Sequence, residues 1–128
     1  MRLALSIPVV SNGGVASHAA ALQCLQETGC VAVMVATALL QNPELFLPHA
    51  EAPSNGQALG HCLAYLASCE AYPPWSLRWV RDHLRALLAS VAPLAVLKAL
   101  EQVEPAEWRH TCQQLRGILK ALAVSLGP

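Results

Sequence analysis

The first 36 residues contain two short, uninterrupted apolar runs separated by an amphipathic segment. The runs are Ile7 to Ser11 and Cys30 to Val35, and continuous apolar stretches of this length are typical of strands buried on both faces of a parallel sheet. Between them, Ser17 stands where a helix N-cap is expected, and Gly29 stands where the helix should end. The pattern predicts a strand, a helix and a second strand parallel to the first.

Beyond the loop expected at residues 47–56, apolar positions repeat with the period of a helix. A first helix would place Leu59, Cys62, Leu63 and Leu66 on one face. Later helices are expected from about Trp75 to Ser90, from Pro93 to about Gln102, and from Glu104-Pro105 onward. Their expected inward positions are Val80, Leu84, Leu87, Leu88, Val91, Trp108, Thr111, Leu115, Ile118, Leu119 and Leu122. Trp75, Trp79 and Trp108 are interpreted as packing anchors.

Two strands cannot form a stable sheet alone, and a doubly buried parallel pair needs neighbours at both edges. We therefore interpret residues 1–47 as the end of a larger α/β domain. Residues 56–128 are interpreted as a helical bundle that follows it. The predicted fold class is α/β and then all-α.

The length and composition of the chain exclude several classes of protein. The chain has 128 residues, which is too few for a complete (β/α)₈ barrel of at least about 200 residues. Its 55% apolar content excludes intrinsic disorder. No apolar run reaches the roughly 18 residues of a membrane span, so no membrane association is expected. The five cysteines form no C-x-x-C pair, which predicts reduced thiols in a cytoplasmic protein and no metal site.

The net charge of zero conceals an uneven distribution. Residues 1–76 carry one basic and four acidic side chains, whereas residues 77–128 carry seven basic and four acidic ones. Two groups of basic residues have helical spacing: Arg78, Arg81 and Arg85, and Arg109, Arg116 and Lys120. Such faces suit a nucleic-acid backbone, although an ordinary solvated helix face relieved by Asp82 and Glu107 has the same spacing.

The ends of the two expected strands form the best candidate site. Asn12-Gly13-Gly14 follows the first strand, and Ala36-Thr37 follows the second. Ligands of parallel α/β folds bind at the carboxyl ends of strands, and glycines allow backbone N–H groups to approach an anion. The pattern favours a phosphate site, with a plain turn as the alternative. No nucleophile–base pair is found, so no catalytic residue is assigned.

Three stretches carry a resemblance to a known family. They are IPVVSNGGV (Ile7 to Val15), ETGCVAVMVATALLQNPELF (Glu27 to Phe46) and WVRDHLRAL (Trp79 to Leu87). In this order they resemble the tRNA-dihydrouridine synthases, which typically show IPV-x-x-NG, then TG-x-x-GVM-x-x-x-x-L-x-NP-x-LF, then R-x-H-L in a helical domain.

The resemblance implies the end of an FMN-dependent TIM (β/α)₈ barrel followed by a helical tRNA-binding domain. FMN would carry hydride from NADPH to a uridine in tRNA. Asn12, Gly13 and Gly14 match one phosphate-gripping turn of the family, and Ala36 and Thr37 match the other. Arg81 and His83 match the R-x-H-L element, and the expected RNA-binding residues are Arg78, Arg81, His83 and Arg85.

The sequence departs from the family pattern in three places. Thr37 replaces the usual arginine, which removes a bidentate phosphate partner. Ala38 stands where glycine is common, and Val31-Ala32-Val33 lacks the usual glycine. The family's catalytic cysteine lies in earlier barrel strands, and none of the five cysteines matches its motif.

The expectation is therefore a fragment that is inactive alone and lacks the N-terminal part of the barrel. A non-enzymatic helical module that binds RNA or protein is the main alternative. A small phosphate-binding protein completed by self-association is a third.

Overall fold

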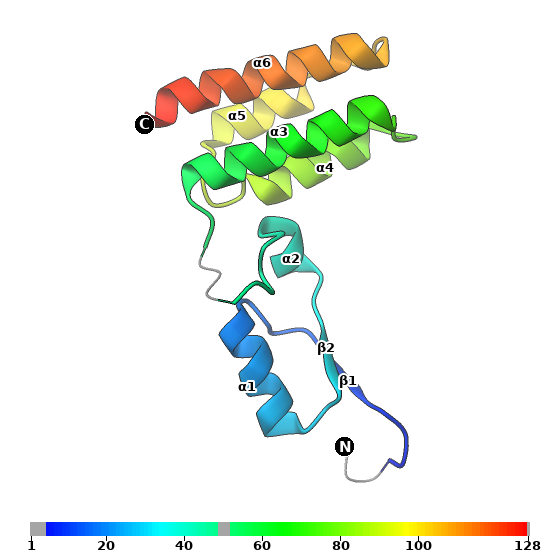
Figure 1. Ribbon diagram of the computed structural model, residues 1–128. Coiled ribbons are helices and arrows are strands. Elements are labelled where there is room, and N and C mark those ends of the chain that lie inside the picture. Colours follow the sequence, from blue (N-terminus) through cyan, green and yellow to red (C-terminus); the bar gives the residue numbers. More distant parts are fainter. Residues whose placement is uncertain (1–4, 49–51, 128) are drawn as a thin grey trace. The chain divides into compact units, whose positions relative to one another are not determined.

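The computed structural model describes residues 5–48 and 52–127 of the chain. These form two compact units, Met1–Ala52 and Pro53–Pro128. The first contains the strands and two helices, and the second contains four helices (Figure 1).

The first unit is built on a parallel strand pair. Strand β1 (Val10–Asn12) is followed by helix α1 (His18–Thr28), strand β2 (Ala32–Met34) and the short helix α2 (Thr37–Gln41). The register aligns Val10 with Ala32 and Asn12 with Met34. Helix α1 contacts both strands, which confirms the predicted strand–helix–strand unit, although each strand is shorter than expected.

Local sequence signals set both ends of α1. The Ser17 hydroxyl accepts a hydrogen bond from the Ala20 N–H at 3.1 Å, as an N-cap should. Gly29 takes the left-handed conformation at φ 61° and donates its N–H to the Leu25 carbonyl at 2.8 Å. Both signals were read correctly from the sequence because caps depend on a few adjacent residues.

The expectation that both strands are buried on two faces is wrong for this chain. Val31 and Met34 are 59% and 54% exposed, and Val10 is also exposed. The physical reason is that α1 covers one side of the pair, and among residues 5–48 and 52–127 no further strand pairs with either edge. The apolar sequence of these strands therefore exceeds what this unit buries.

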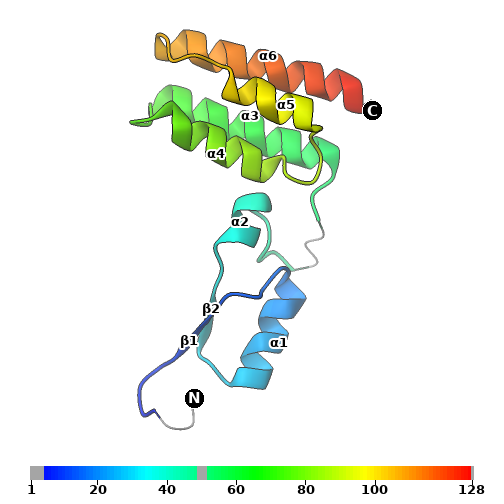
Figure 2. The ribbon, with the colours of Figure 1, turned by 180° about the vertical axis from the view of Figure 1, so that it is seen from behind.

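The second unit is a four-helix bundle. Its helices are α3 (Asn55–Ala71), α4 (Leu77–Leu87), α5 (Leu94–Glu101) and α6 (Trp108–Leu126). Each contacts two of the others, in the cycle α3–α4–α5–α6–α3. The chain alternates in direction from one helix to the next, as Figures 1 and 2 show. This is the up–down topology that short connections favour.

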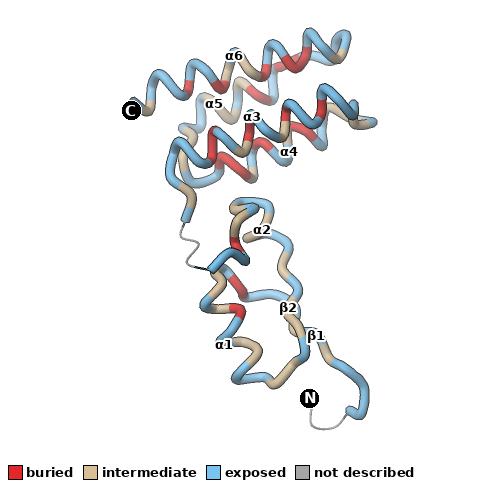
Figure 3. Tube along the Cα trace, viewed as in Figure 1, coloured by how far each residue is buried: buried red, intermediate tan, exposed pale blue. Residues whose placement is uncertain are grey.

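The buried residues of the bundle lie on the facing sides of the helices (Figure 3). Ser54 and Gln57 form a reciprocal capping box that starts α3. The fully buried large side chains are Leu66, Val80, Leu84, Leu88, Leu100, Leu115, Leu119 and Leu122. Most of the predicted inward positions are therefore confirmed.

Several details of the helical prediction are wrong. Helix α4 ends at Leu87 instead of continuing to Ser90. Leu63 is exposed, although the other three residues predicted for the inward face of α3 are buried. Trp75 is 96% exposed and Trp79 is also largely exposed, so neither anchors the core. Trp108 does pack against it.

The cysteines are free thiols, and three of them, Cys62, Cys69 and Cys112, are buried. Burial raises the pKa of the Cys62 thiol to about 12, which keeps it protonated and unreactive at neutral pH. Within residues 5–48 and 52–127, no group of three or more His, Cys, Asp or Glu side chains is placed to hold a metal ion. No helix in those same ranges is both long and apolar enough to cross a membrane.

Candidate phosphate and nucleic-acid sites

The two strand-end loops begin at the same edge of the parallel pair. Asn12 and Met34 are aligned as the last residues of β1 and β2, and the Gly13 N–H donates to the Met34 carbonyl at 3.3 Å. The Asn12-Gly13-Gly14 turn begins at the last residue of β1. The Ala36-Thr37 pair begins two residues after the last residue of β2. The geometry thus gathers both predicted phosphate loops at one edge, with these five residues exposed.

The two glycines have the backbone geometry that a phosphate turn needs. Gly13 and Gly14 have φ angles of 95° and 73°, which other residues rarely adopt. A Cβ at either position would meet no atom within 4 Å, so the space in front of the backbone is open. A group such as the FMN phosphate could approach this turn closely.

Charge is what this edge lacks. Residues 5–48 contain neither lysine nor arginine. Thr37 begins α2, and the preceding residue, Ala36, makes no side-chain capping bond. A phosphate held here would depend on backbone N–H groups and on the Thr37 hydroxyl. The shape of the edge fits a phosphate, but the electrostatic attraction is weak.

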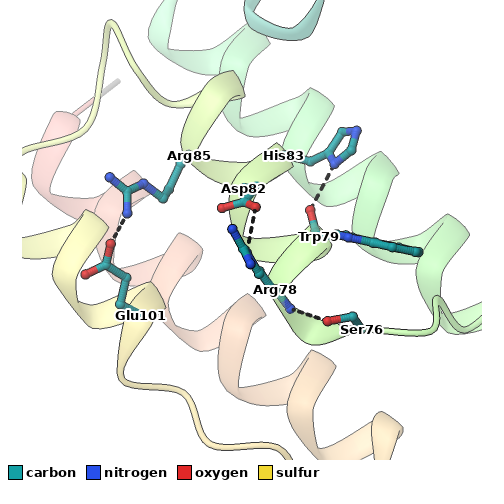
Figure 4. A network of polar contacts seen from close by, with 7 residues as sticks. All are labelled: Ser76, Arg78, Trp79, Asp82, His83, Arg85 and Glu101. Atoms are coloured by element: carbon teal, nitrogen blue, oxygen red, sulfur yellow. Dashed lines mark hydrogen bonds and ion pairs between the residues drawn. The ribbon is translucent and has the colours of Figure 1, made fainter.

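On α4, the first and the last of the three arginines, Arg78 and Arg85, are paired with acidic side chains (Figure 4). Arg78 lies 3.7 Å from Asp82, one turn later on the same helix, and both side chains are largely exposed. Arg85 forms an ion pair with Glu101 of α5. Exposed pairs of this kind are weak, so both arginines can exchange their partners for a phosphate at little cost.

Arg81 and His83 both make contacts inside the helical unit. The half-buried Arg81 donates from Nη2 to the carbonyl of Val103, in the segment before α6. His83 donates from Nδ1 to the Trp79 carbonyl at 2.9 Å, and its ring stacks on Tyr65 of α3 at a centroid distance of 5.1 Å. Both side chains therefore help to pack α4 against its neighbours. Their contact with RNA stays a prediction.

Replacing Arg81 with methionine tests this structural role. We expect Arg81→Met to destabilise the helical unit by about 1–2 kcal/mol, because the Val103 carbonyl loses a charge-assisted hydrogen bond while the stem's packing is kept. Arg78→Met is the matched control and should change stability by less than about 0.5 kcal/mol. Urea unfolding followed by circular dichroism measures both. Equal midpoints for the two variants would contradict the role given to Arg81.

The second basic face, on α6, is only partly paired. Arg116 donates to Glu70 of α3 at 2.9 Å, an ion pair that joins residues 46 positions apart in the chain. Beside it, α3 and α6 line a pocket that the sequence did not predict. Helical spacing revealed the arginine, but nothing in the local pattern pointed to its partner on another helix.

Comparison with known proteins identifies the family. The family model for dihydrouridine synthase matches residues 1–120, which is most of the chain.

The chain belongs to the dihydrouridine synthase family.

Curated relatives agree with this assignment. The chain is 40% identical over 93 residues to tRNA-dihydrouridine synthase B of Xanthomonas axonopodis pv. citri, covering 70% of this chain and 24% of that protein. It is 38% identical, with the same coverage, to tRNA-dihydrouridine synthase B of Xanthomonas campestris pv. campestris. An uncharacterized tRNA-dihydrouridine synthase-like protein of Caenorhabditis elegans is 39% identical over 51 residues, covering 40% of this chain and 18% of that protein. The chain thus spans about a quarter of the length of the Xanthomonas relatives.

Proposed function

We propose that this chain is the C-terminal part of a flavin-dependent tRNA-dihydrouridine synthase that acts on tRNA in the cytoplasm. Residues 1–47 would close the FMN-binding barrel, and residues 56–128 would bind tRNA. The observation that carries the proposal is the parallel β1–β2 pair, whose two candidate phosphate loops leave from the same edge. In barrels of this class, the loops after the last two strands often hold a phosphate.

Exposed apolar residues in and beside the strands support the same proposal. Val10, Val31 and Met34 belong to apolar runs typical of a buried sheet, yet they are exposed in this unit. Neighbouring barrel strands and helices would bury them, because parallel sheets are normally covered on both faces. This part of the chain is thus suited to a larger barrel.

Each part of the chain has a limited role in this proposal. When bound, FMN supplies hydride transfer to the uridine, with NADPH as the reductant. Asn12, Gly13 and Gly14 would hold its phosphate from one loop, and Ala36 and Thr37 from the other. Arg78 and Arg85 would contact the RNA backbone, with Arg81 and His83 holding α4 in place. No residue of this chain is assigned to protonate the uridine.

A reconstitution experiment tests the proposal. The purified chain, supplied with FMN, NADPH and unmodified tRNA, is expected to bind tRNA but to form no dihydrouridine. Binding should weaken with salt, with a slope of log K against log salt of about −2 to −4, since a few cations meet phosphates. Gel shifts at several salt concentrations and a dihydrouridine assay measure the two outcomes.

The results separate the proposal from its alternatives. Dihydrouridine formation by this chain alone would overturn its inactivity. Salt-independent binding, or no binding, would overturn the RNA-contacting role of the helical unit. Tight tRNA binding without any measurable affinity for FMN would favour the non-enzymatic RNA-binding module. A stable dimer in light scattering, together with phosphate binding, would favour the self-associating alternative.

A further inference from the structure

A polar pocket lies on the helical unit, and none of its lining residues belongs to α4. Its volume is about 410 Å³, within the range of small-ligand sites. It is lined by Glu70, Trp108, Arg109, Gln113 and Arg116. One aromatic ring, two guanidinium groups, a carboxylate and an amide therefore converge on one volume.

The aromatic wall is held in a fixed position. Trp108 is half-buried and packs against the core of the bundle. Its indole Nε1–H donates to the Cys69 carbonyl of α3 at 2.6 Å. A ring fixed at one edge and lining a pocket is a ready surface for stacking, since a ligand does not have to order it first.

The charges of the pocket are arranged for an anion with polar edges. The ion pair with Glu70 holds Arg116 in place, while only one of its five N–H donors serves that hydrogen bond. Arg109 lies two turns earlier on α6 and, within the described residues, forms no ion pair. It also stands in the first turn of α6, where the helix dipole adds positive potential.

We propose that this pocket binds one nucleotide of the RNA, with the base stacked on Trp108 and the phosphate paired with Arg109. Gln113 lies between the two arginines along α6 and would hydrogen-bond the polar edge of the base. This inference rests on the proposed function, because it names the place on the helical unit where RNA is gripped.

The contrast with α4 supports this choice. There, Arg81 donates to the Val103 carbonyl, and a phosphate would first have to displace the acidic partners of Arg78 and Arg85. On α6, Arg109 is exposed next to a concave surface that already contains an aromatic ring. A nucleotide needs both a cation and a stacking surface, and the pocket provides both.

Uridine 5′-monophosphate and inorganic phosphate serve as direct probes of the pocket in the full chain. We expect the nucleotide to shift the Trp108 indole resonance in NMR titrations and to bind at least about fivefold more tightly than phosphate. Arg109→Glu should weaken nucleotide binding by about tenfold or more, and Gln113→Ala by a few fold. Lys98→Glu makes the same charge change at an exposed residue of α5 that neither lines the pocket nor belongs to the residues assigned to RNA on α4, so it should alter nucleotide binding by less than about twofold.

Each outcome decides the inference. Equal affinities for phosphate and nucleotide would overturn stacking on Trp108, and equal effects of Arg109→Glu and Lys98→Glu would overturn the site itself. With tRNA, Arg109→Glu should weaken binding more than Lys98→Glu does. If the wild-type chain binds tRNA and the two variants weaken it equally, the inference fails while the proposed function stands. If the wild-type chain does not bind tRNA, the proposed function fails, whatever the mononucleotide result.

Discussion

Replacing Leu66 with alanine is expected to destabilise the helical unit by about 3 kcal/mol and to lower its melting temperature by on the order of 15 °C. Leu66 is 0% exposed and belongs to the core that α3 shares with the other helices. The substitution removes three buried carbon atoms and leaves a cavity that the surrounding leucines can fill only in part. Thermal and urea unfolding followed by circular dichroism measure the loss.

The same helix offers a matched control. Leu63 lies three residues earlier on α3 and is 41% exposed. Leu63→Ala makes the same chemical change, but we expect it to cost less than about 1 kcal/mol. Part of the Leu63 side chain is already in contact with water, so its removal loses less buried apolar area and leaves no enclosed cavity. Similar losses for the two variants would show that the bundle packs differently from the arrangement described above.

This pair of leucines shows how far the helical pattern can be read. The buried positions of α3 are Ala58, Leu59, Cys62, Leu66 and Cys69. The last four recur at spacings of three and four residues. Leu63 fits the same apolar stripe by period alone. The width of the buried stripe depends on how closely α4 and α6 approach α3, which is a property of residues far away in the chain. Periodicity therefore predicted the helix and most of its core, but not the edge of that core.

The polar residues show a similar limit. Helical spacing placed Arg81 and Arg116 on basic faces, yet their partners, Val103 and Glu70, lie 22 and 46 residues away. Neither contact has a local signature, so the sequence could not separate a solvated arginine from one that joins two helices. The pocket beside Trp108 was missed for the same reason, because it exists only when α3 and α6 are packed together.

The strands gave the reverse result. Their order, direction and connecting helix were predicted correctly, because caps, turns and apolar runs are local signals. Their burial was not, because burial depends on neighbours that the two strands do not contact in this unit. The candidate phosphate edge could be located from the sequence because turns and apolar runs are local signals. Its affinity for FMN depends on the positive charge at that edge, which a substitution can change.

Thr37→Arg is expected to tighten the binding of FMN by the chain by about tenfold. The strand-end edge has open, left-handed glycines, but residues 5–48 contain no lysine or arginine. An arginine at this position would supply a planar, bidentate partner for a phosphate. Charge-assisted hydrogen bonds contribute about 1.5–3 kcal/mol, and exposure at this edge reduces the expected gain to about 1.4 kcal/mol, which is a factor of ten. Titration of FMN fluorescence measures the change.

Gln26→Arg is the control that separates position from charge. Gln26 is exposed and lies in the last turn of α1, which leads into the start of β2, so it adds the same charge at the opposite end of the strand pair. We expect it to change FMN affinity by less than about twofold, and the gain from Thr37→Arg to shrink as salt is raised. Equal gains from both variants would indicate general electrostatic attraction. No gain from Thr37→Arg would remove the strand-end edge as the phosphate site, because a cation placed beside a true phosphate cradle must strengthen it.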